Sequence, residues 1–137
     1  MLFKGLSLTF KKDDKIREEV EKFWDTMSSI YGANKLRGLV YNQTVDTIEY
    51  AIGFKNGEML RAEREKLVEQ YHNIEYKVVY LPYYGWKEYS GKTKHVDQAL
   101  EIIKSEGPTK LELHEFSRGK RGRKYIIKVN RRTKFTK

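Results

Sequence analysis

The chain has 137 residues, a length that suits a single domain spanning residues 1–137. Its hydrophobic content of 39% and aromatic content of 13% are those of a globular protein, and the absence of cysteine excludes disulfide frameworks, cysteine-ligated zinc and thiol catalysis. The formal net charge is +9, and no apolar run approaches the roughly 18 residues of a membrane span, so we expect a cytoplasmic protein with no membrane partner.

The first half of the chain has the pattern strand–helix–strand–strand. Leu6, Leu8 and Phe10 alternate along the first strand, and apolar residues recur at helical spacing in the segment that follows. Asp13 or Asp14 is expected to cap this helix, and a glycine at position 32 is expected to end it. The predicted elements are a strand at 3–10, a helix at 13–32, and strands at 36–42 and 46–54.

The second half repeats this order. A strand at 85–91 leads to a helix at 94–108, and strands at 110–116 and 123–130 flank a polar turn. Between the halves, residues 57–72 have helical spacing, and residues 74–82 read as a strand that feeds the second half. The predicted organisation is module one at 2–55, a connector at 56–73, module two at 74–130 and a basic tail at 131–137.

Matching residues in the two halves are also separated by nearly constant distances along the sequence. A shift of 75 residues places Leu36 on Leu111 and Tyr50 on Tyr125 without a gap, and a shift of 80 places Ile16 on Val96. Matching hairpins and a matching helix in the same order indicate a tandem duplication. We therefore predict an α+β fold in which two strand–helix–strand–strand modules form an antiparallel curved sheet, with helices on one face and a central ligand groove on the other.

Alternation along the strands predicts which side chains share a face. Tyr50 and Ile52 are assigned to the helix side of the sheet, and Ala51 and Gly53 to the other side, where their small size leaves room for a flat ligand. Aromatic rings and carboxylates in one groove suit a lipophilic cation. The other reading makes the acids exposed strand residues and the aromatics packing residues. The groove is predicted to hold Tyr41, Glu49, Tyr84, Trp86, Glu112, His114 and Phe116, with Tyr89 left to packing.

The basic charge lies at one end of the sequence. Residues 118–137 contain ten Lys or Arg and no acid, whereas the first 117 residues contain 18 basic and 19 acidic side chains. Such a segment is suited to phosphate backbones, or else forms a hairpin turn with a solubilising tail. The candidate nucleic-acid contacts are Arg118, Lys120, Arg121, Arg123, Lys124, Arg131 and Arg132.

Three segments resemble the GyrI-like family, the small-molecule-binding domain of gyrase-inhibitory proteins and multidrug-sensing transcription activators. They are LPYYGWKEYSGKTKHVDQAL (81–100), the hairpin RGLVYN followed by EYAIGF, and GPTKLELHEF (107–116). The resemblance implies two strand–helix–strand–strand modules around a pocket for hydrophobic, often cationic, compounds. It implies that Glu112 is the pocket acid, that Trp86 and Tyr41 are its aromatic residues, and that His114 stands where a tyrosine is usual.

Three classes of function follow. The first is non-catalytic binding of lipophilic, cationic small molecules, for sensing or sequestration, without a cofactor and without a helix-turn-helix reader of its own. The second is a regulatory protein that contacts DNA, gyrase or a transcription regulator through the basic end. The third is a small-molecule hydrolase in which Trp86 and Glu112 position a water. The histidines at 72, 95 and 114 lack metal-ligand spacing.

Overall fold

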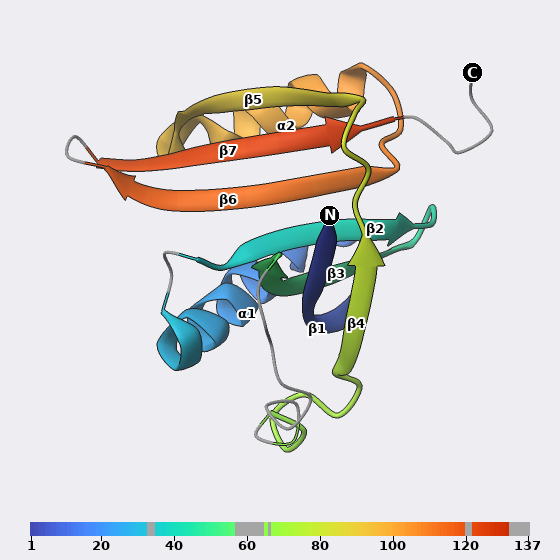
Figure 1. The fold of residues 1–137 in the computed structure, drawn as a ribbon, viewed down its shortest axis with the longest axis vertical. Coiled ribbons are helices and arrows are strands. Elements are labelled where there is room, and N and C mark those ends of the chain that lie inside the picture. The colour runs from blue at the N-terminus through green and yellow to red at the C-terminus, as the bar shows by residue number, and fades with distance from the viewer. Residues whose placement is uncertain (33–34, 57–64, 66, 120–121, 132–137) are drawn as a thin grey trace.

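Seven strands form one antiparallel sheet in the order β4-β1-β3-β2-β6-β7-β5 (Figure 1). The computed structural model describes all residues except 33–34, 57–64, 66, 120–121 and 132–137. The strands are β1 (Leu2–Lys11), β2 (Arg37–Gln43), β3 (Thr47–Lys55), β4 (Glu75–Tyr80), β5 (Trp86–Lys92), β6 (Leu111–Gly119) and β7 (Gly122–Asn130). The helices are α1 (Ile16–Tyr31), α2 (Val96–Ser105) and the short 3-10 helix η2 (Thr93–His95). Within the described residues, no helix is long and apolar enough to cross a membrane.

The strand order confirms the α+β fold built from two similar modules. The sequence β1-β3-β2 in one half is matched by β5-β7-β6 in the other, and β2 pairs with β6 where the halves meet. β4 adds to the far edge of the first half, where it pairs with β1. Residues 74–82 lead along the chain into β5, as predicted, but the strand that they form, β4, pairs with β1 of the first half.

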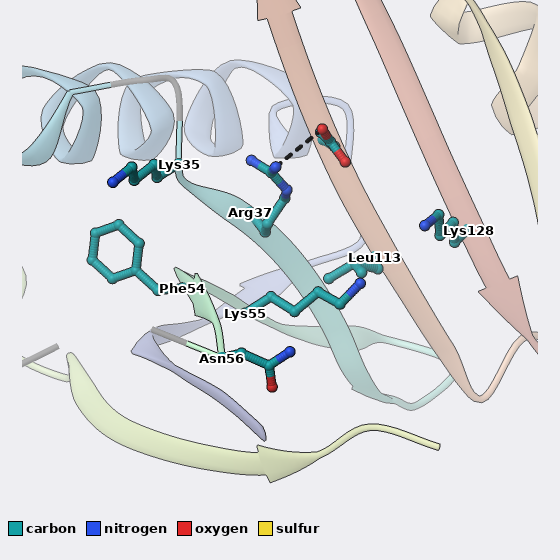
Figure 2. A pocket seen from close by; sticks show the side chains of 8 residues that line it. Lys35, Arg37, Phe54, Lys55, Asn56, Leu113 and Lys128 are labelled. Atoms are coloured by element: carbon teal, nitrogen blue, oxygen red, sulfur yellow. Dashed lines mark ion pairs between the residues drawn. The ribbon is translucent and has the colours of Figure 1, made fainter. Parts of the chain in front are cut away.

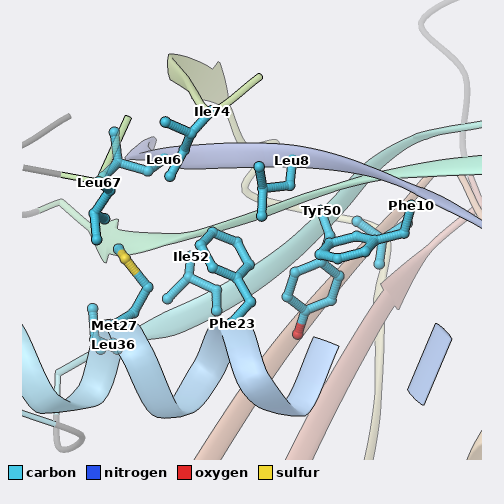
Figure 3. Packing of buried hydrophobic residues seen from close by; sticks show 11 residues of the cluster. Leu6, Leu8, Phe10, Phe23, Met27, Leu36, Tyr50, Ile52, Leu67 and Ile74 are labelled. Atoms are coloured by element: carbon cyan, nitrogen blue, oxygen red, sulfur yellow. The ribbon is translucent and has the colours of Figure 1, made fainter. Parts of the chain in front are cut away.

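Helix α1 covers the first half of the sheet. Its Phe23 and Met27 are fully buried against β1 and β3 (Figure 3), and burial of each such side chain stabilises the fold by about 1.5–3 kcal/mol. The glycine at position 32 ends the helix as predicted, with a φ of 79°. The predicted aspartate cap is wrong: Lys15 is the N-cap residue, and the carboxylate of Asp13, two residues before it, accepts the Lys15 backbone N–H at 2.9 Å.

Helix α2 covers the second half and has its own core. The buried side chains of this cluster are Ala99, Ile103, Tyr125, Ile127 and Val129. Tyr89 packs against them from β5, which confirms its predicted packing role. The link between the halves runs from β4 to β5 across the opposite side of the sheet (Figure 1).

The sheet face without helices, called here the open face, is filled at its centre. Phe3, Leu39, Ala51, Leu81, Leu111 and Leu113 form a buried cluster there, with Tyr41 and Trp86 against it. Ala51 has no exposed surface, so it leaves no room for a flat ligand. Gly53 leaves none either, because a Cβ there would overlap the Lys4 carbonyl oxygen of the neighbouring strand. The predicted groove is therefore occupied by the chain itself.

The register between the halves corrects one predicted face. Tyr50 pairs with Val40, whereas its counterpart Tyr125 pairs with Phe116, so β2 and β6 match at a shift of 76 residues rather than 75. A shift of one residue moves every side chain of a strand to the other face. Glu112, His114 and Phe116 consequently lie on the helix side, contrary to prediction, and Leu111, Leu113 and Glu115 lie on the open face.

Candidate functional sites

The structure separates the predicted groove residues into three places. Tyr41, Glu49 and Trp86 lie on the open face. Glu112, His114 and Phe116 lie on the helix side, and Tyr84 is 81% exposed in the link between β4 and β5. Because Trp86 and Glu112 are on opposite faces of the sheet, they do not form the predicted pair that would position a water.

Trp86 and Tyr84 attach the link to the sheet. The Trp86 indole N–H donates to the Pro82 carbonyl at 2.7 Å, and the ring packs on the open-face cluster. The Asn130 side-chain amide donates to the Tyr84 carbonyl at 3.0 Å. Both contacts hold backbone in place, so the tryptophan that stands out in the sequence acts here as a packing residue.

A buried chain of hydrogen bonds connects the two modules on the helix side. The Trp24 indole N–H donates to the Tyr50 hydroxyl at 2.9 Å, and Tyr50 Oη lies 2.9 Å from His114 Nδ1. An indole N–H can only donate, so the Tyr50 hydroxyl is free to give its own proton to Nδ1. His114 Nε2 then carries the ring proton and points to Glu112 Oε1 at 3.4 Å. Burial raises the pKa of Tyr50 well above its ordinary value, which keeps this hydroxyl protonated.

The Glu112 carboxylate is the last group in this chain of hydrogen bonds, and it accepts further hydrogen bonds from neighbouring side chains. Thr109 Oγ1 donates to Glu112 Oε2 at 2.6 Å, and the Gln43 amide donates to the same oxygen at 3.2 Å. Burial acts to raise the pKa of Glu112, but the bonds from His114, Thr109 and Gln43 together hold it below its ordinary value. Gln43 reaches this side because a bulge between Val40 and Asn42 reverses the alternation of β2.

The lowered pKa of Glu112 predicts a pH-dependent stability. A carboxylate with a depressed folded-state pKa stabilises the fold above its unfolded value of about 4.3, and this contribution is lost as the pH falls through the folded pKa. Glu112→Gln should therefore be less stable than the parent at pH 7 and close to it at pH 3. Urea denaturation at pH 7, 5 and 3 measures the difference, with the exposed Glu101→Gln as control. A gap between Glu112→Gln and the parent that is constant with pH would contradict the prediction.

Sequence reasoning missed Trp24, Tyr50 and Gly38 as partners in one site. A Cβ at Gly38 would overlap the Tyr50 hydroxyl and crowd the Trp24 ring, so the glycine makes room for this bond. The signal available in the sequence was Gly38 in the middle of a strand, because such a glycine often marks a place where another group packs close to the backbone. It could not be assigned to these rings before α1 was placed over β2.

A cavity of about 600 Å³ lies beside the edge of β1. β4 pairs with β1 only as far as Ser7 opposite Glu75, so β1 continues past it to Lys11 without that neighbour. Helix α1 and residues 71–75 form the other walls. Called here the β1-edge cavity, it is lined by the acids Glu19, Glu49 and Glu75, the aromatics Phe10 and Tyr71, and Lys22 and His72, among others.

A second cavity, of about 370 Å³, lies on the open face beside the junction of β2 and β6 (Figure 2). It is called here the open-face cavity. Four cations and one acid line it together with an amide and two apolar side chains. These residues are Lys35, Arg37, Lys55, Lys128, Glu115, Asn56, Phe54 and Leu113.

Comparison with known proteins gives a distant likeness to solved structures. No protein-family model matches the chain, and no curated protein matches it. Among solved structures, the chain is similar to a hydrolase from Listeria innocua, with 11% sequence identity, a TM-score of 0.41, and coverage of 93% of this chain and 86% of that chain. A likeness at this level carries no conclusion about activity, and the resemblance to the GyrI-like family stays a prediction.

Only some of the predicted nucleic-acid contacts in the basic end lie within the described residues. Lys120, Arg121 and Arg132 and the side chain of Arg118 lie outside them, whereas Arg123 and Lys124 are exposed at the start of β7. Arg131 is held against α2: its guanidinium donates to the Ile103 carbonyl at 2.8 Å and lies 3.7 Å from the Glu106 carboxylate. Arg131 therefore caps the end of a helix. Among the described side chains, no group of three His, Asp or Glu is placed to hold a metal ion.

Proposed function

We propose that this protein is a non-catalytic binder of lipophilic cations, for sensing or sequestration, and that the ligand occupies the β1-edge cavity. The observation that supports this proposal is the gathering of three carboxylates, on α1, β3 and β4, around one cavity that also has aromatic walls. A cavity of about 600 Å³ is within the usual range for small-molecule sites.

The charges of this cavity favour a cation. Its lining has Glu19, Glu49 and Glu75 against Lys22, with Lys77 pairing to Glu75 at 3.1 Å from outside the lining. Glu49 accepts the Asn42 amide at 2.8 Å, which orients its carboxylate. Aromatic rings attract cations through their negative faces, and Phe10 and Tyr71 supply rings here. The proposal gives Glu49 the ligand-contact role predicted from the sequence, whereas Glu112 lies on the helix side and not among the residues that line this cavity.

The test uses two ions of the same shape and opposite charge. Tetraphenylphosphonium should raise the unfolding temperature, and tetraphenylborate should not. At a concentration about 100-fold above Kd, the bound cation stabilises the folded state by about 2.7 kcal/mol. The double variant Glu19→Gln/Glu49→Gln should weaken binding about tenfold, because each partly exposed charge pair contributes modestly. Glu88→Gln/Glu101→Gln removes the same charge from residues outside the cavity. Equal effects of the two ions, or equal binding by both double variants, would contradict the proposal.

The second candidate is contact with DNA or gyrase through the basic end. The exposed Arg123 and Lys124 support it, and the use of Arg131 as a helix cap counts against part of the patch. Phosphate contacts predict an affinity that falls steeply with added salt. A salt-independent affinity for duplex DNA, unchanged in Arg123→Gln/Lys124→Gln, would exclude this candidate.

A further inference from the structure

The open-face cavity has the opposite charge from the β1-edge cavity. Lys35, Arg37, Lys55 and Lys128 line it, and the only carboxylate in its described lining is that of Glu115. In Figure 2 the Lys55 side chain points toward Leu113, with Arg37 and Lys128 on either side of that leucine. Basic side chains from β2, β3 and β7 therefore converge on one apolar contact.

The acids near this cavity leave an excess of positive charge. Arg37 pairs with Glu115 at 3.0 Å, and Lys128 lies 3.9 Å from Glu88 on the neighbouring strand β5. Within the described residues, Lys35 and Lys55 form no ion pair. Among the described residues, four cations face two carboxylates even when Glu88 is counted. An anion that enters this cavity can therefore contact the ammonium groups of Lys35 and Lys55 without breaking an ion pair between described residues.

Arg37 is held in position before any ligand arrives. Its guanidinium donates to the Leu36 carbonyl at 3.0 Å and pairs with Glu115, and its side chain is 21% exposed. A guanidinium fixed in this way loses little further side-chain freedom when it contacts an anion. The floor beneath it is apolar, since Leu113 belongs to the open-face cluster with Leu39 and Leu111.

We propose that the open-face cavity binds a small organic anion, with a carboxylate, sulfonate or phosphate head between the lysines and a short apolar body on Leu113. A volume of about 370 Å³ lies at the low end for ligand sites, which restricts the body to a small one. This site is separate from the cation site, because the two cavities share no lining residue.

The test uses a probe pair that differs in the head group alone. 8-Anilinonaphthalene-1-sulfonate is the anion, and N-phenyl-1-naphthylamine is the same aromatic body without the sulfonate. Titration calorimetry of the intact chain should show the sulfonate binding more tightly than the neutral amine, and less tightly as salt is added. Chemical shifts of the Leu113 methyl groups should move with the sulfonate.

The variant Lys55→Gln/Lys128→Gln should weaken sulfonate binding about tenfold, since each partly exposed charge contributes modestly. Lys94→Gln/Lys104→Gln, which removes the same charge from η2 and α2 and from neither cavity, should leave it unchanged. Equal binding of the two probes, or equal loss in both variants, would overturn the anion site. Binding of tetraphenylphosphonium is measured in the same variants, so that a failure of the anion site is distinguished from a failure of the cation site.

Discussion

Replacement of Gly53 with alanine is expected to lower the free energy of unfolding by about 3 kcal/mol, at the upper end of what overpacking costs. Gly53 lies directly opposite Gly5 in the pairing of β1 with β3. A Cβ at position 53 would overlap the Lys4 carbonyl oxygen and the Gly5 Cα, which are backbone atoms of the adjacent strand. A flexible side chain could move aside, but here the two strands must separate and weaken their ladder.

The matched control for Gly53→Ala is Gly91→Ala on β5. A Cβ at Gly91 would lie 3.2 Å from the Tyr125 hydroxyl, a side-chain atom that can shift by a few tenths of an ångström. We expect a change of less than about 1 kcal/mol there, because alanine restricts the unfolded chain more than glycine does. Thermal unfolding should show a fall of about 10 °C for Gly53→Ala and little for Gly91→Ala. Similar unfolding temperatures for the two variants would contradict the close approach of β1 and β3.

Replacement of Tyr50 with phenylalanine is the second change with a large expected effect. It removes the hydroxyl that accepts from Trp24 and lies against His114 Nδ1, so two polar atoms lose their partner at once. Each buried polar group left without a partner costs about 1–3 kcal/mol, and we expect a loss of about 2–4 kcal/mol in total. The side chain keeps its ring, so the apolar packing of the core around α1 is preserved.

Tyr41→Phe on the open face provides the control for Tyr50→Phe. The Tyr41 hydroxyl makes one hydrogen bond, to Ser7 Oγ at 2.7 Å, in a partly buried place. Its loss should cost about 1 kcal/mol. Guanidinium denaturation measures both variants, and the slopes should match that of the parent. Equal losses for the two variants would show that the chain from Trp24 to Glu112 adds nothing beyond a single bond.

Much of the fold could be predicted from the residues alone. Apolar positions at helical spacing identified α1 and α2, and alternation identified the strands, because these periods follow from backbone geometry within each segment. The order of elements in the two halves then indicated the duplication. The assignment of Tyr50 and Ile52 to the helix side was right, since β3 and β7 place alternate large apolar residues against a helix in both halves.

The candidate sites could be predicted much less well. Trp86, Tyr41 and Glu49 were placed on the correct face, but the open face proved to be filled by Phe3, Leu81 and their neighbours. Leu81 and Phe3 come from the link and from β1, and their meeting over Ala51 depends on how the link crosses the sheet. Nothing in the local pattern of either segment determines that crossing.

The sequence by itself determined the elements, their order and the side of each strand that packs within its own module. The tertiary structure decided the face of Glu112. In the first hairpin Val40 pairs with Tyr50, ten residues apart, and in the second Phe116 pairs with Tyr125, nine apart, so no single shift aligns both strands. The pairing of β6 with β7 and with β2 places Glu112 on the helix side, and a difference of one residue moves its carboxylate from a groove to a buried hydrogen-bond chain.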